Sequence, residues 1–297
     1  MPVRRDPVPR CRDALIGRRS ASTFARAVMN VSDFLGLQPT HNPHRWFMPL
    51  TPGICVGPPD NMFMFGGVGL ASAIGAMERT TGRPLIWATA QYLSYAKPPS
   101  VVDLDVWTPA AGKYNTQARV IGHVGDKEIF TVNAALGSRT LDISGQWPRM
   151  PDVPRPEECQ RPPGFPNSAG TIHDQVELRV ARGRYGTERD GTPSHDGRSA
   201  LWIRLPRELD RSAAGLAIVA DWVPSGIGQA LGRWAGGNSL DNTIRILDLV
   251  PTDWVLCDIQ VHGIAKGFGH GRVHLWSEDG RLMATGNQSL IVRMHDE

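Results

Sequence analysis

The chain has 297 residues, which is enough for two domains of about 150 residues or for one large domain. Hydrophobic residues make up 41% and charged residues 21% of it, ordinary proportions that exclude a disordered, collagen-like or coiled-coil protein. The formal net charge of +3 is too small and too dispersed to indicate a nucleic-acid-binding surface.

The first 28 residues are rich in arginine and lack the apolar core of a signal peptide. They precede Met29, which opens a clean apolar segment. We expect residues 1–28 to be a disordered extension without a folded role. A transit-like peptide and a mis-assigned start codon are the alternatives.

Residues 29–143 are predicted to form one unit, a helix followed by an antiparallel meander. Small and apolar residues recur at helical spacing over residues 65–78. Four strands follow at residues 85–95, 101–108, 115–124 and 127–136, with alternating β-branched residues and Gly/Asp turns as the signals. The prolines that crowd residues 144–166 then predict a surface linker, which we bound at 144–170.

Residues 171–297 are predicted to form a second unit of the same kind. A helix is expected over 211–223, ended by Pro224, and strands over 238–248, 254–264, 267–276 and 281–292. At an offset of 153 residues, segment 99–130 falls without gaps on segment 252–283. A helix and an antiparallel sheet that wraps it, present twice in one chain, predict an α+β double hotdog.

The repeat points to functional residues, because a polar residue opposite an apolar counterpart has been chosen by something besides folding. Three positions in the second half meet this test, Ser239, Asp241 and Gln288. At the offset of 153, their counterparts are Ile86, Ala88 and Ala135. Gln288 also interrupts an otherwise apolar strand face, where a buried amide needs hydrogen-bond partners.

Asp221 is a fourth anomaly. On the predicted helix it shares a stripe with Ala214, Ala217 and Ile218, at the C-terminal end where the helix dipole disfavours an anion. A carboxylate in such a place tends to have a raised pKa, which suits a general base near neutral pH. Taken singly, Asp221 on a solvent-facing turn, Ser239 at a strand start and Gln288 at an edge are equally good interpretations. Asp241 either competes with Ser239, since both lie on the same predicted strand face, or caps a rim.

Several motifs together resemble the type II acyl-CoA thioesterases, double-hotdog hydrolases of fatty acyl-CoA, over about residues 30–295. They are Phe65-Gly66-Gly67 at the first helix, Ala96-Lys97-Pro98, the proline-rich linker, Trp202-Ile203-Arg204 and the last strand with Gln288. The resemblance implies that Asp221, Ser239 and Gln288 hold the water that attacks the thioester. It also implies a homodimer of double hotdogs. Val68, where the family often has Gln, and the segment 241–251 depart from the pattern and leave the substrate preference open.

The implied mechanism is direct hydrolysis without an acyl-enzyme, with main-chain amides around Gly66 and Gly67 as candidates for oxyanion stabilisation. A non-catalytic acyl-CoA-binding protein is the alternative. An enoyl-CoA hydratase fits less well, because neither predicted helix begins with the required Asp and His.

No cofactor is implied and no metal site is expected, since the scattered histidines lack partners at ligand spacing. No apolar run reaches the roughly 20 residues of a membrane helix, so no membrane span is expected. Because the net charge is small, no nucleic-acid partner is expected either. The cysteines form no CxxC pair, which fits a reducing cytoplasm; they are Cys11, Cys55, Cys159 and Cys257.

Overall fold

The computed structural model describes residues 29–295 except 163–168, 186–188 and 207–211, and the extension expected at residues 1–28 lies outside them. The helices are α1 (Val31–Phe34), η1 (Pro52–Ile54), α2 (Gly66–Thr81), η2 (Pro156–Glu158), α3 (Ile172–Gln175), α4 (Ala213–Ala220) and α5 (Val223–Leu231). The strands of the first half are β1 (Gln38–Pro39), β2 (Arg45–Leu50), β3 (Cys55–Val56), β4 (Phe63–Met64), β5 (Leu85–Tyr92), β6 (Ser100–Ala111), β7 (Asn115–Val124) and β8 (Lys127–Gly137). Those of the second half are β9 (Glu177–Arg182), β10 (Arg198–Arg204), β11 (Ala235–Ser239), β12 (Asp241–Ile246), β13 (Val255–Ala265), β14 (Phe268–Ser277) and β15 (Leu282–Met294).

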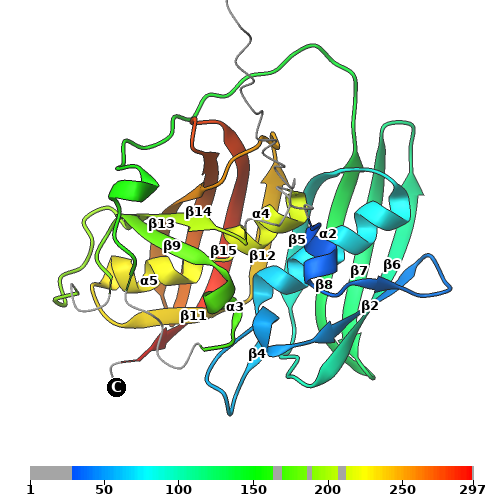
Figure 1. Ribbon diagram of the computed structural model, residues 1–297, viewed down its shortest axis with the longest axis horizontal. Coiled ribbons are helices and arrows are strands. Elements are labelled where there is room, and N and C mark those ends of the chain that lie inside the picture. Colours follow the sequence, from blue (N-terminus) through cyan, green and yellow to red (C-terminus); the bar gives the residue numbers. More distant parts are fainter. Residues whose placement is uncertain (1–28, 163–168, 186–188, 207–211, 296–297) are drawn as a thin grey trace, which may run out of the picture.

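One long antiparallel sheet organises the molecule, and its strand order is symmetric about its centre. The order is β1-β2-β6-β7-β8-β5-β12-β15-β14-β13-β10-β9, with β11 also paired to β15. Each half therefore uses the same path, and the halves join where β5 pairs with β12 (Figure 1). At this junction Thr89 lies opposite Thr243, with their hydroxyl oxygens 2.8 Å apart. This is the predicted double hotdog, although the outer strands β1, β2, β9 and β10 were not anticipated.

The register of the strands corrects the alignment of the two halves. Thr89 pairs with Asn133 in the first half, and Thr243 pairs with Asn287 in the second, so these strands correspond at an offset of 154 residues. The offset of 153 holds only for β6 with β13 and β7 with β14. It changes because the hairpin that joins β14 to β15 has one residue more between corresponding pairs: eight residues separate the paired Leu275 and Ala284, whereas seven separate the paired Gly122 and Phe130.

The corrected alignment changes the counterparts of the candidate residues. Those of Ser239, Asp241 and Gln288 are Leu85, Trp87 and Ala134, and not Ile86, Ala88 and Ala135. The polar residues still stand opposite apolar ones, so the test that singled them out survives.

Helices α2 and α4 pack together inside the wrapped sheet (Figure 1). All eight residues of α4 are buried, because its composition of alanine, glycine, leucine, isoleucine and valine leaves no polar face. Helix α2 begins directly at Gly66 and is capped at its C-terminus by Gly82, which adopts the left-handed conformation with φ of 65°. The prediction for residues 65–78 is confirmed, with an extension of one turn.

The second predicted helix is two helices in the structure. Residues 213–220 form α4, and Pro224 lies in the first turn of α5 instead of ending the first helix. A proline is well suited to that place, because the first N–H groups of a helix have no intrahelical partner. The break between the two helices is at Asp221 and Trp222.

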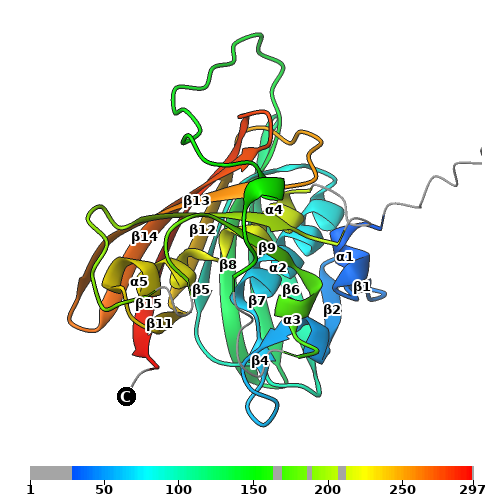
Figure 2. The same cartoon turned by 60° about the vertical axis from the view of Figure 1, so that its left-hand side comes forward.

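The proline-rich linker runs over the outside of the sheet. After β8 the chain arches over the molecule toward the second half (Figures 1 and 2). Met150 and Val153 then pack on a buried cluster on the outer face of the sheet, which we call the Trp202 cluster. Its members are Cys159, Ala200, Trp202, Trp254, Leu256, Trp276 and Leu282. The indole of Trp202 donates to the carbonyl of Pro154 at 2.9 Å.

Candidate active site

Asp221 is buried at the C-terminal cap of α4, between the two central helices. Only 4% of it is exposed, although it follows the last residue of α4, where the helix dipole disfavours an anion. The next residue, Trp222, packs edge-on against Phe65, with ring centroids 5.2 Å apart. This contact holds the C-terminus of α4 against the N-terminus of α2. The solvent-facing alternative for Asp221 is therefore wrong.

Four donors surround the Asp221 carboxylate. The N–H of Gly67 donates to Oδ2 at 2.6 Å. The other oxygen, Oδ1, accepts from Nε2 of Gln288, from Nδ2 of Asn242 at 3.2 Å and from the hydroxyl of Ser239 at 3.5 Å. The three residues predicted to act together are thus in mutual contact.

Gln288 lies at the centre of this group. Its Nε2 donates to Ser239 Oγ at 2.6 Å as well as to Asp221, and 2% of the residue is exposed. Its Oε1 is buried and has no hydrogen-bond partner among the described residues. The amide therefore offers one acceptor beside the carboxylate that a donor from outside the protein can satisfy.

Burial raises the pKa of Asp221 to about 7, from an ordinary value of 3.8. Hydrogen bonds from Gln288, Gly67, Ser239 and Asn242 act in the opposite direction, because they favour the charged form. The balance leaves a carboxyl group that exchanges its proton near neutral pH, as a general base requires.

Gly66 and Gly67 are required by how closely the two helices approach. A Cβ added at Gly67 would lie 2.9 Å from the Asp221 Cβ and 3.0 Å from the carbonyl oxygen of Ala217. A Cβ added at Gly66 would lie 2.8 Å from Oδ2 of Asp221. Since the Gly67 N–H is engaged by the carboxylate, Gly66 is the stronger of the two candidates for an oxyanion donor.

The predicted strand 238–248 breaks at Leu240, and the break re-aims the side chains that follow. The N–H of Leu240 donates to the carbonyl of Ser289, and its own carbonyl accepts from Tyr92. Ser239 and Asn242 consequently both reach Asp221, whereas a continuous strand would place Ser239 and Asp241 on one face. The prediction of a shared face is wrong for Asp241. Its Oδ1 accepts from the Ser289 N–H at 2.6 Å, as the rim-capping alternative describes.

Asn242 and Tyr92 also lie at the candidate site, Asn242 as a donor to Asp221 and Tyr92 as a donor to the carbonyl of Gly66, although the sequence patterns did not single them out. At the corrected offset of 154, buried Asn242 corresponds to Ala88, and Tyr92 corresponds to Ile246. Both therefore satisfy the test of a polar residue opposite an apolar one. The one-residue difference in turn length concealed them.

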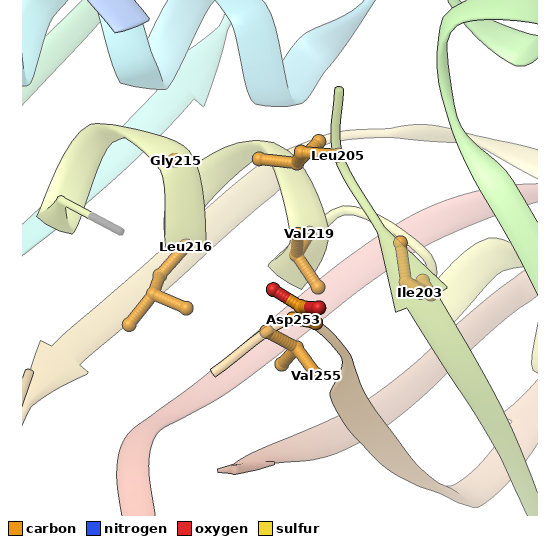
Figure 3. Close-up of a pocket in the computed structure, with 7 residues that line it drawn as sticks. All are labelled: Ile203, Leu205, Gly215, Leu216, Val219, Asp253 and Val255. Carbon is orange, nitrogen blue, oxygen red and sulfur yellow. The ribbon is translucent and has the colours of Figure 1, made fainter. Parts of the chain in front are cut away.

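A small pocket lies elsewhere on α4. Its lining is mainly apolar and comes from Ile203, Leu205, Gly215, Leu216, Val219, Asp253 and Val255 (Figure 3). None of the residues that contact Asp221 lines it. We therefore assign it no part in the chemistry.

Within the described residues, no group of three His, Cys, Asp or Glu side chains is placed to hold a metal ion. No described helix is long and apolar enough to cross a membrane.

The chain is similar to known thioesterases in sequence and in structure. Residues 156–292 match the family described as the acyl-CoA thioesterase C-terminal domain. The crystal structure of a candidate thioesterase from Novosphingobium aromaticivorans is 35% identical, with a TM-score of 0.75 over 86% of this chain and 97% of that one. The chain belongs to the type II acyl-CoA thioesterase family. It is accordingly an enzyme that hydrolyses the thioester bond of acyl-CoA.

Solved structures of lower sequence identity share the fold. A hot dog protein from Alicyclobacillus acidocaldarius is 19% identical, with a TM-score of 0.75 over 88% of this chain and 97% of its own. An acyl-CoA thioesterase II from Mycobacterium marinum is 17% identical, with a TM-score of 0.67 over 89% of this chain and 97% of its own. No curated protein matches the chain. The double-hotdog fold of this thioesterase is thus confirmed.

Proposed function

We propose that this thioesterase hydrolyses fatty acyl-CoA by direct attack of water, with Asp221 as the general base and Ser239 and Gln288 orienting the water. The observation that carries the proposal is the contact of these three side chains around one buried carboxylate oxygen, Oδ1 of Asp221. The unpartnered Oε1 of Gln288 supports it, because a water molecule there can donate one proton to Gln288 and the other to Asp221.

The reaction follows from these positions. The water oxygen forms a bond to the thioester carbonyl carbon while its proton passes to the Asp221 carboxylate. The resulting tetrahedral oxyanion collapses, the bond between carbon and sulfur breaks, and the proton returns to the sulfur of the leaving CoA. The products are the free acid and CoA, and no acyl-enzyme forms. General-base assistance of this kind is typically worth about 10² to 10⁴ in rate.

The oxyanion needs a donor, and the start of α2 supports Gly66 in this role. The first N–H groups of a helix have no intrahelical acceptor, and the helix dipole adds positive potential there. One such donor is worth roughly 3 kcal/mol in the transition state. The Gly67 N–H already serves Asp221.

The hydratase alternative lacks support at the helix starts. The first residues of α2 are glycines and those of α4 are alanines, so neither helix begins with the Asp and His pair of that chemistry.

We further propose that the protein is a homodimer of double hotdogs, with units at residues 29–143 and 171–297 joined by a linker at 144–170. The symmetric strand path supports the two units, and the family resemblance supports the dimer.

We also propose a cytoplasmic location. It is supported by the described cysteines, Cys55, Cys159 and Cys257, which are free thiols.

The test is release of free thiol from short-, medium- and long-chain acyl-CoA by wild type and by Asp221→Asn, at equal concentrations of folded protein. We expect turnover that is highest with a fatty acyl chain and falls at least a hundredfold in the variant. Asp241→Asn is the matched control, because that carboxylate contacts Ser289 and not Asp221. Turnover untouched by Asp221→Asn would mean that another group is the base.

A further inference from the structure

The hydroxyl of Tyr92 and the carboxylate of Asp221 bind opposite ends of one peptide group. Tyr92 donates to the carbonyl oxygen of Gly66 at 2.7 Å, and the N–H of Gly67 donates to Oδ2 of Asp221 at 2.6 Å. That carbonyl and that N–H belong to the same planar peptide unit. A continuous chain of hydrogen bonds thus runs from the phenol to the proposed base.

We propose that Tyr92 is a positioning residue for Asp221 and acts through the Gly66–Gly67 peptide group. The inference rests on the proposed function of Asp221 and adds a residue from the other half of the molecule. Tyr92 ends β5 of the first half, whereas the side chains that contact Oδ1 of Asp221 all come from the second half.

The chemistry of the chain of bonds gives the expected effect. A peptide whose carbonyl accepts a hydrogen bond becomes a stronger donor at its N–H, because the two bonds polarise each other. A stronger bond from Gly67 stabilises the ionised form of Asp221 and fixes Oδ2, which leaves Oδ1 directed at Ser239 and Gln288. Tyr92 thereby favours the form of the base that accepts a proton.

Tyr92 is suited to remain a donor at every working pH. Burial, together with the charges of Asp221 and Asp241, raises the pKa of its phenol well above the ordinary value of 10.0. The nearby His173, whose ring packs edge-on against Trp222, has a pKa lowered to about 4 by burial and is neutral over the range of a rate profile. Asp221 is therefore the group whose titration we expect Tyr92 to control.

The first test compares the pH dependence of kcat/KM for wild type and Tyr92→Phe, which keeps the ring and removes the hydroxyl. We expect the acid limb to move up by about half a pH unit, a rough value for the loss of one polarising bond. The kcat/KM of the variant would then be about threefold lower than that of wild type at pH 6 and equal to it at pH 9. A deficit of the same size at every pH would indicate a purely structural role and overturn the proposal. Tyr95→Phe is the matched control, since Tyr95 is 47% exposed on the same segment, and its profile should equal that of wild type.

A second measurement does not depend on turnover or on removing a side chain. The carboxyl carbon of Asp221, identified by its loss in Asp221→Asn, is titrated by NMR in the resting protein. Replacement of Tyr92 by a fluorinated tyrosine, a stronger donor of the same shape, should lower the pKa of Asp221. An unchanged pKa would refute the role of Tyr92. If the pKa of Asp221 is lowered but the Asp221→Asn variant still hydrolyses acyl-CoA, the hydrogen-bonded coupling of Tyr92 to Asp221 stands. In that case the proposed role of Asp221 as the base is rejected.

Discussion

The N–H of Gly67 lies 2.6 Å from Oδ2 of Asp221, so the first turn of α2 in one half binds the buried carboxylate of the other. The two helices can approach this closely only because residue 67 has no side chain. A Cβ there would lie 2.9 Å from the Cβ of Asp221 and 3.0 Å from the carbonyl oxygen of Ala217, closer than van der Waals contact allows. We expect Gly67→Ala to separate the two helices and to destabilise the protein by about 1–3 kcal/mol. Activity should fall with it. Chemical denaturation and thiol release check both effects, and Gly82→Ala, at the far end of α2, should cost stability without a specific loss of turnover.

The pH–rate profile should report the titration of Asp221. A base works only when ionised, and the pKa of this carboxyl is raised to about 7, so kcat/KM should rise with pH through this value and level off above it. If the base were an exposed aspartate, kcat/KM would instead rise at a pH near 4. The measurement is a profile from pH 5 to 9 with a medium-chain acyl-CoA. A flat profile below pH 6 would contradict the role of Asp221.

The same titration should affect stability. The folded protein binds the Asp221 proton up to about pH 7, whereas the unfolded chain releases it near 3.8, so the folded state holds more protons between these values. Stability from this group is fully present below the lower value and is lost as the pH rises through the upper one. The free energy of unfolding of Asp221→Asn, measured against wild type, should therefore gain about 2–4 kcal/mol from pH 4 to pH 8. Urea denaturation at both pH values gives the difference, and a constant difference would exclude a raised pKa.

Asn242 is expected to support the base without being needed for folding. Its Nδ2 lies 3.2 Å from Oδ1 of Asp221, and its counterpart in the first half is Ala88. Asn242→Ala should reduce kcat/KM about tenfold at neutral pH, as expected for loss of a hydrogen bond of about 1.5 kcal/mol to a charged group. The effect should shrink at high pH. Asn287→Ala, at an exposed position beside Gln288, is the control and should leave the rate unchanged.

The linker should stabilise the second half through the Trp202 cluster. Trp202→Ala removes a buried indole and its bond to Pro154, for an expected loss of about 3–5 kcal/mol. Trp202→Phe keeps most of the packing and should cost about 1 kcal/mol. Trp147→Ala is the comparison, because that indole is 87% exposed on the same linker and its removal should change the melting temperature little.

Much of this fold was predictable from local patterns. The meander strands and the helix at residues 65–78 follow from alternation, turn residues and helical spacing, and the structure confirms them except that the predicted strand 238–248 is divided into β11 and β12. Strands β2 and β10 were missed because a proline near the end of the strand, as at Pro49, or a continuous apolar run, as at Leu201–Ile203, disguises the period of two. Their pairing depends on distant partners in β6 and β13.

The site was predictable where one residue was anomalous in its own element, as for Asp221 and Gln288. It was not predictable where neighbours depend on register. The break at Leu240 exchanges the faces of Asp241 and Asn242, and it arises from bonds to Ser289 and Tyr92, which are remote in sequence. Pro224 illustrates a related limit, since a proline can follow the end of one helix or, as here, stand in the first turn of the next.

The symmetric strand path has a further consequence. Two identical hotdogs related by a two-fold axis would each have to bury the same amides and carboxylates, at a desolvation cost in both. In this chain Gln288 and Asn242 are related by the pseudo-two-fold axis to Ala134 and Ala88, two buried residues whose side chains carry no polar atom. The first half instead contributes the main-chain N–H of Gly67 and the phenol of Tyr92 to the proposed site. The desolvation cost of the two buried side-chain amides thus arises once in this chain and not twice.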